Sequence, residues 1–253
     1  MLGQEKLISK IDSYNISTFP HSCLLVGQRG DPFIEVSEYI SDKFCIPLFD
    51  ITETISDEYI SEIYMSPNFG LYTVDMSKVT EREQNILLKF FEEPNQFTYI
   101  LLWCESKYNL LPTIESRSFE LDFEKYDYSL LEPLAKEKDL TLKLCSTPGQ
   151  IAVANATDME SLYNLCKTIL NKMNKAAYFN ALTISDKINF KDEYNKYDLY
   201  LFIRMLSYVL LTENGYKMYE ALSDFNKKVW PLLNKKQYFE NFVTNLWLLS
   251  REA

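Results

Sequence analysis

A pair of glycines near the amino terminus could belong to a phosphate-binding loop. Gly27 and Gly30 follow a short apolar run, as a glycine turn follows a buried strand. A loop that supports nucleotide hydrolysis continues with Gly-Lys-Ser/Thr, where the lysine neutralises phosphate charge and the hydroxyl binds magnesium. This chain instead has Pro32, Phe33 and Ile34, and Pro32 also lacks an N–H group to donate. The sequence therefore predicts a plain strand-to-helix turn that does not bind ATP productively.

Residues for metal or covalent chemistry are scarce and scattered. The single histidine is His21, and the cysteines form no CxxC pair; they are Cys23, Cys45, Cys104, Cys145 and Cys166. A zinc cluster, a disulfide framework and a histidine-dependent triad all need closer or more numerous partners. We therefore expect buried free thiols, a structural histidine, no metal site and no cofactor.

Composition and charge describe an ordinary globular chain with an acidic front portion. Of its 253 residues 47% are hydrophobic and 25% are charged, and the net charge is −10. Residues 1–159 hold 26 acids and 13 bases (−13), whereas residues 160–253 hold 10 acids and 13 bases (+3). Because DNA affinity depends on Lys and Arg replacing counterions, we expect that, if nucleic acid is involved, other subunits carry most of the contact. With no signal peptide and no apolar run near the ~20 residues of a membrane span, we expect a cytoplasmic protein without membrane contact.

The first half of the chain alternates strand-like and helix-like stretches, which predicts right-handed βαβ crossovers with helices on both faces of a parallel sheet. The expected strands are short apolar runs at residues 22–26, 47–51, 71–75, 98–103 and 119–123.

The clearest helix is expected at residues 81–93. Thr80 and Glu83 have the spacing of a capping box, and Pro94 would end the helix. Its core-facing stripe consists of Ile86, Leu87, Phe90 and Phe91.

After about residue 125 the strand-like runs stop and helical patterns follow. Residues 128–145 and 148–156 are typical of a small helical unit, whose last helix starts at Pro148-Gly149. Later apolar stretches also recur at helical spacing, at residues 162–170, 201–211, 229–233 and 239–249. The predicted domains are residues 1–125, 126–157 and 158–253.

Several motifs share one order along the chain and together resemble a known family. They are GQE (3–5), FPHSCLLVGQRG (19–30), YTVD (72–75), QNILLKFFEEP (84–94), LLPTIESRS (110–118) and TPGQ (147–150). In this order and spacing they resemble the AAA+ subunits of sliding-clamp loaders, most closely the delta-prime subunit of bacterial DNA polymerase III. The resemblance implies an α/β RecA-like AAA+ domain, a small helical lid and an all-α, collar-like C-terminal domain that oligomerises.

Departures from the family pattern concern the nucleotide site. Phe33 and Ile34 replace the lysine and the Ser/Thr; Asp75 is kept, but Met76 stands where the water-activating glutamate would follow; and Gln150 replaces an arginine of the lid. The resemblance thus implies a vestigial site with no intrinsic ATPase activity. The four-cysteine zinc module of delta-prime members is absent too, since its interval holds Cys45 alone.

Ser116 and Arg117 are the part of the family machinery that this chain retains. In the family this motif presents an arginine finger to ATP on the neighbouring subunit, where a fixed guanidinium stabilises charge on the γ-phosphate. The resemblance implies a non-hydrolysing stator, with other AAA+ loader subunits, a sliding clamp and, through the complex, DNA as partners. Two alternatives stay open: a weak ATPase that binds nucleotide through backbone amides, and an AAA+-derived interaction module of another assembly.

Overall fold

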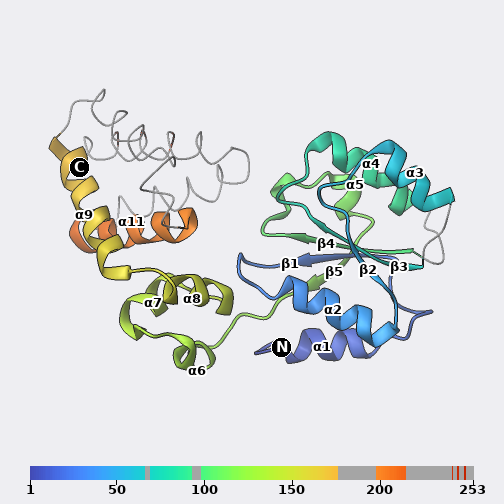
Figure 1. Ribbon diagram of the computed structural model, residues 1–253, viewed down its shortest axis with the longest axis horizontal. Coiled ribbons are helices and arrows are strands. Elements are labelled where there is room, and N and C mark those ends of the chain that lie inside the picture. The colour runs from blue at the N-terminus through green and yellow to red at the C-terminus, as the bar shows by residue number, and fades with distance from the viewer. Residues whose placement is uncertain are drawn as a thin grey trace. The chain divides into compact units, whose positions relative to one another are not determined.

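Figure 1 shows a computed structural model of the chain, which describes residues 1–65, 69–92, 98–175 and 198–214 and the single residues 241, 244 and 248. The chain divides into two compact units, Met1–Leu130 and Leu131–Ala253. The predicted division into three domains at residues 125 and 157 stays a prediction.

The first unit is built on a five-stranded parallel sheet in the order β2-β3-β4-β1-β5. Its strands are β1 (Ser22–Val26), β2 (Leu48–Asp50), β3 (Gly70–Asp75), β4 (Thr98–Cys104) and β5 (Phe119–Asp122). These bounds confirm the five predicted strands, because each end of a strand lies within one residue of its predicted position. In the centre of the sheet, Cys23 lies beside Leu101 and Phe119, and Leu25 lies beside Trp103 and Leu121. The apolar runs are explained by this position, since a central parallel strand is covered on both faces.

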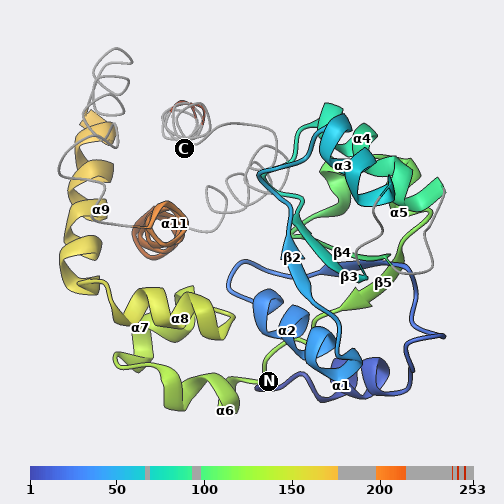
Figure 2. The same ribbon diagram turned by 45° about the vertical axis from the view of Figure 1, so that its right-hand side comes forward.

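Helices cover both faces of the sheet (Figures 1 and 2). Helices α1 (Glu5–Asp12) and α2 (Phe33–Phe44) lie on one face, and α3 (Asp57–Met65), α4 (Glu81–Glu92) and α5 (Pro112–Glu115) lie on the other. Each face has its own apolar core. One contains Leu7, Ile11, Val36 and Ile40, and the other contains Ile60, Leu87, Phe90 and Ile114.

Helix α4 begins with the predicted capping box. The backbone N–H of Thr80 donates to the Glu83 carboxylate at 2.7 Å, and the N–H of Glu83 donates to the Thr80 hydroxyl at 3.4 Å. The hydrogen bonds that Thr80 donates lower the pKa of Glu83. Leu87 and Phe90 are buried, as predicted for the core-facing stripe. Pro94, which was predicted to end the helix, lies outside the described residues.

Replacing Thr80 by alanine should weaken this helix start. The Thr80→Ala variant loses the hydroxyl that accepts from the Glu83 N–H, so we expect the free energy of unfolding to fall by about 1 kcal/mol. Urea denaturation followed by circular dichroism measures the change. Thr168→Ala is the control, since that hydroxyl only bonds the Asn164 carbonyl within an exposed helix face. Equal stabilities of the Thr80 variant and the parent would contradict the capping assignment.

The second unit is helical in its described part. Its elements, after the short α6 (Tyr128–Leu131) at the boundary, are η2 (Glu132–Leu134), α7 (Lys138–Leu144), α8 (Pro148–Asn155), α9 (Met159–Lys175) and α11 (Leu199–Asn214). Helix α8 starts at Pro148 as predicted, and the Thr147 hydroxyl caps it by accepting from the Gln150 N–H at 3.3 Å. The apolar segments expected near 229–233 and 239–249 lie outside the described residues, apart from 241, 244 and 248.

Candidate functional site

The glycine loop joins the end of β1 to the start of α2. The N–H of Gly27 donates to the Cys104 carbonyl at 3.1 Å, which continues the pairing of β1 with β4 into the loop. Gly30 has a φ of +85°, a left-handed conformation that a residue with a side chain rarely adopts. Pro32 then precedes the first residue of α2, Phe33. The two glycines thus lie in the turn between β1 and α2, and their lack of a nucleotide role stays a prediction.

The Asp31 side chain folds back into this loop. Its Oδ2 atom accepts a hydrogen bond from the Gln28 N–H at 2.5 Å. A Cβ atom added at Gly27 would lie 2.7 Å from the same oxygen and 2.4 Å from the Phe123 ring. A loop amide is thus bound by the chain's own carboxylate, and the Phe123 ring takes up the space beside the first glycine.

Burial makes this carboxylate costly to ionise. Desolvation raises the pKa of Asp31 from 3.8 to about 6, although the Gln28 hydrogen bond works in the opposite direction. Its second oxygen, Oδ1, has no hydrogen-bond partner among the described residues, and neither do the Trp103 Nε1 and Tyr126 hydroxyl groups. Burial and the charge of Asp31 also raise the pKa of Tyr126. The unpaired buried polar atoms of the described chain therefore all belong to residues around the loop.

The raised pKa predicts a pH-dependent stability. Between about pH 4 and 6 the folded chain keeps a proton that the unfolded chain releases, so the free energy of unfolding falls as pH rises through this range. Asp31→Asn keeps an oxygen for the Gln28 N–H without the charge. We expect this variant to be more stable than the parent at pH 7 by about 1 kcal/mol, because partial exposure screens the full electrostatic effect. Urea denaturation at pH 4 and pH 7 measures it, and a difference that is the same at both values would contradict the assignment.

Phe33 and Ile34, which stand where a hydrolysing loop has its lysine and hydroxyl, point to different surroundings. The Phe33 ring packs on Trp103 with ring centroids 5.8 Å apart and joins the core beneath α2. Ile34 is 65% exposed. Neither side chain can neutralise or ligate a phosphate, and the vestigial nature of the loop stays a prediction.

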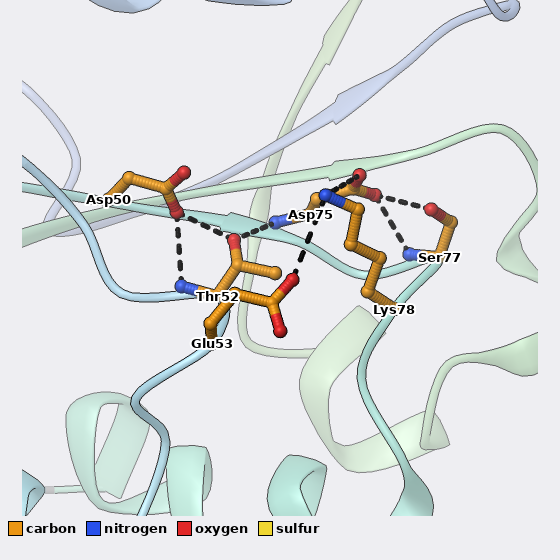
Figure 3. A network of polar contacts seen from close by, with 6 residues as sticks. All are labelled: Asp50, Thr52, Glu53, Asp75, Ser77 and Lys78. Carbon is orange, nitrogen blue, oxygen red and sulfur yellow. Dashed lines mark hydrogen bonds and ion pairs between the residues drawn. The ribbon is translucent and has the colours of Figure 1, made fainter.

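Asp75, at the end of β3, is bound by its own neighbours (Figure 3). Its Oδ1 atom accepts from the Ser77 N–H at 3.0 Å and from the Ser77 hydroxyl at 2.6 Å. Its Oδ2 atom lies 3.8 Å from the Lys78 ammonium group, which lies equally far from Glu53. Met76, in place of the expected glutamate, is buried. The side chain of Asp75 thus binds a local amide, a hydroxyl and an ammonium group.

The backbone of Asp75 is tied to the preceding strand. Its N–H donates to the Thr52 hydroxyl at 3.0 Å, and Thr52 in turn donates its hydroxyl and its N–H to Asp50 at 2.7 and 3.0 Å (Figure 3). This chain of bonds fixes the carboxyl ends of β2 and β3 together. Despite these carboxylates, no group of side chains in the described residues has the make-up of a metal site.

Gln150, at the position of the family's lid arginine, is engaged inside the second unit. Its Oε1 atom accepts from the Ser146 N–H and from the Arg204 guanidinium, both at 2.9 Å. Arg204 also donates to the Leu144 carbonyl and lies over the Tyr200 ring, 4.7 Å from its centroid. Arg204 was not among the predicted site residues, although a lone charge inside the apolar run 199–211 indicates an internal partner.

Ser116 and Arg117 follow the short helix α5 and precede β5. The Arg117 carbonyl accepts from the Ser22 hydroxyl at 2.8 Å, which attaches this turn to the first residue of β1. The Arg117 side chain is exposed and donates to the Thr113 carbonyl at 3.2 Å. Ser116 bonds the same carbonyl at 3.3 Å. Among the described residues no carboxylate pairs with the Arg117 guanidinium.

Side chains from other elements hold this segment. The Gln84 side chain, buried on α4, accepts from the Leu111 N–H at 2.9 Å just before α5 begins. Lys107, in the 3-10 helix η1 (Lys107–Asn109), lies 3.6 Å from Glu115 and hydrogen-bonds Glu120. The contacts of Gln84, which was quoted only as part of a motif, and of Lys107 were not predicted, because nothing in the local pattern reveals partners this far along the chain.

Arg117 and the glycine loop lie at opposite edges of the sheet. Arg117 precedes β5 and bonds Ser22, where β1 starts, whereas Gly27 follows the last residue of β1. Because the strands are parallel, the two features are separated by the length of β1, about 13 Å at 3.3 Å per residue. The Arg117 turn therefore lies away from the loop of its own chain.

The remaining candidates for chemistry have structural surroundings. His21 stacks on Tyr99, and its Nδ1 lies 3.2 Å from the Thr98 carbonyl.

All the cysteines are free. Four are buried as expected, but Cys45 is exposed at the end of α2, which corrects the expectation of buried thiols throughout. In the described part of the chain, every helix is too short or too polar to cross a membrane.

Comparisons with known proteins agree with this architecture. Residues 54–127 match the family model of the DNA polymerase III delta subunit. The matched residues run from α3 to β5. No curated protein matches the chain.

Two solved structures from Thermotoga maritima are similar over nearly the whole chain. A DNA polymerase III gamma subunit-related protein is 19% identical, with 99% of each chain covered and a TM-score of 0.49. A point variant of RuvB is 14% identical, with 99% of this chain and 88% of that chain covered and a TM-score of 0.53. The likeness to RuvB and the order of the strands show an AAA+ fold. The chain thus has the AAA+ fold, and its residues 54–127 are similar to the delta-subunit family of DNA polymerase III.

Proposed function

We propose that this chain is a non-hydrolysing, delta-prime-like subunit of a DNA sliding-clamp loader. It holds neighbouring ATPase subunits in place and presents Arg117 to the nucleotide of one of them. The observation that carries the proposal is the position of Arg117. Its guanidinium is exposed, has no acidic partner among the described residues, and lies at the edge of the sheet away from its own glycine loop.

A finger has to be held rigidly, since catalysis by a cation depends on its position in the transition state. The turn that carries Arg117 is held by the Ser22 and Gln84 hydrogen bonds. Pro112 further restricts the backbone at the first residue of α5. These restraints favour a presenting role over that of an incidental surface arginine.

The loop supports the non-hydrolysing part of the proposal. Asp31 places a negative charge inside the turn, and Phe33 faces the core where a lysine would face phosphate. A triphosphate in this place would meet like charge at close range and no cation, which is unfavourable in a poorly solvated site. The weak-ATPase alternative would require Asp31 and Phe123 to move out of the loop.

Partners follow from the family match and from charge. A subunit of this family acts beside other AAA+ loader subunits and a sliding clamp, and we propose both as partners. The acidic residues 1–159 make this chain a poor DNA ligand by itself. DNA would then be held mainly by the other subunits.

Replacing Arg117 tests the function directly. In the complex that co-purifies with the tagged chain, Arg117→Ala should lower ATP hydrolysis by at least about tenfold, because charge on the γ-phosphate loses a fixed cation. Arg117→Lys should restore only part of the rate, since an ammonium group lacks the planar fork. Arg82→Ala, an exposed arginine on α4, is the matched control and should leave hydrolysis unchanged.

Two results would contradict the proposal. One is unchanged hydrolysis in an assembled Arg117→Ala complex. The other is a native complex that contains neither an ATPase nor a clamp, which would favour the alternative of an interaction module in another assembly.

The isolated chain should bind ATP only weakly. Because the loop lacks a cation and holds an internal carboxylate, we expect a Kd for labelled ATP above about 1 mM in the presence of magnesium, a binding free energy of less than about 4 kcal/mol. Equilibrium binding measures it, with Ile34→Ala as a control that changes an exposed side chain without adding a cation. A Kd well below this value would favour the weak ATPase.

A further inference from the structure

The turn that carries Arg117 has an acidic residue on either side of it. Glu115 precedes Arg117 by two residues, and Glu120 follows it by three, on β5. Neither carboxylate pairs with the guanidinium. Both instead contact Lys107, which lies 3.6 Å from Glu115 and donates a hydrogen bond to Glu120.

A carboxylate can bind a guanidinium more specifically than it binds an ammonium group. Arg–carboxylate pairs form two parallel hydrogen bonds, whereas a lysine acts as a point charge. Without a competing cation, the Glu115 and Glu120 carboxylates would be free to turn toward other cations nearby, Arg117 included. Two uncompensated carboxylates would also repel an incoming triphosphate.

Lys107 is well placed to compete. The hydrogen bond to Glu120 raises the pKa of the Lys107 ammonium group, so it remains charged at neutral pH. The other lysine near this strand, Lys10, donates to the Glu120 backbone carbonyl and lies over the Phe119 ring, so it leaves the Glu120 carboxylate to Lys107. The side chains are one third to one half exposed, so each single pair is weak, but one cation here serves two acids.

We propose that Lys107 is a positioning residue for the arginine finger: it engages Glu115 and Glu120 and so keeps Arg117 unpaired for a phosphate on the neighbouring subunit. This inference rests on the proposed function, because an unpaired Arg117 matters only if it meets an outside anion. Lys107 itself need not touch the nucleotide.

The test is a charge-removal series in the native complex that co-purifies with the tagged chain. Lys107→Met should lower the kcat of ATP hydrolysis by about fivefold, the effect expected when a surface ion pair is redirected, with a smaller change in KM. The double variant Lys107→Met, Glu115→Gln should recover to within about twofold of the parent, because the freed carboxylate nearer to Arg117 in the sequence is gone. Lys138→Met, which breaks the Lys138–Glu132 pair of the second unit, is the matched control and should leave kcat unchanged.

Each outcome decides between the claims. An unchanged kcat in Lys107→Met, with a strong loss in Arg117→Ala, overturns the role of Lys107 and leaves the proposed function standing. A loss that the Glu115→Gln change does not rescue shows that Lys107 only supports the local fold and also overturns the inference. No loss in Arg117→Ala overturns both. If Lys107→Met fails to assemble, Lys107→Gln, which keeps a donor for Glu120, takes its place with the same expected loss and rescue.

Discussion

The direction of the strands constrains everything else in the first unit. All five strands are parallel, so their carboxyl ends gather the glycine loop and Asp75 at one edge of the sheet, and their amino ends gather Ser22 and the Arg117 turn at the other. No rearrangement of side chains can bring features together across the length of β1. A reaction that needs a phosphate site and this guanidinium must therefore be shared between two chains, each contributing one edge of its sheet.

Polar groups at the positions of the predicted vestigial nucleotide site have partners within the chain. The Asp75 carboxylate binds Ser77 and Lys78, and the Gln150 amide binds Arg204. This is expected of polar groups that are removed from water. Asp31 is the exception, because one of its oxygens stays unpaired among the described residues and its pKa is raised. The loop therefore holds a carboxylate whose ionised form is disfavoured, whereas Asp75 and Gln150 have hydrogen-bond partners.

The sequence predicted the elements well and the long-range contacts poorly, for a physical reason. The strands and the Thr80 cap follow from apolar runs and local hydrogen-bonding spacing, which are properties of neighbouring residues. The bonds from Gln84 to Leu111 and from Arg204 to Gln150 join residues 27 and 54 positions apart. Only the packing of helices brings such residues together. The exposure of Cys45 also depended on structure, because this residue ends α2 in a left-handed conformation.

Arg117 lies in an acidic part of the chain without a carboxylate partner among the described residues. Residues 1–159 hold twice as many acids as bases, and Glu115 and Glu120 lie near Arg117 in the sequence. Sequence distance does not protect it, since Glu115 is only two residues away. A second cation beside the same acids changes the balance, because Lys107 engages both carboxylates. Under the proposed function, Arg117 and its lack of a partner are separate features, and a chain could keep Arg117 and still lose its use through a change at Lys107.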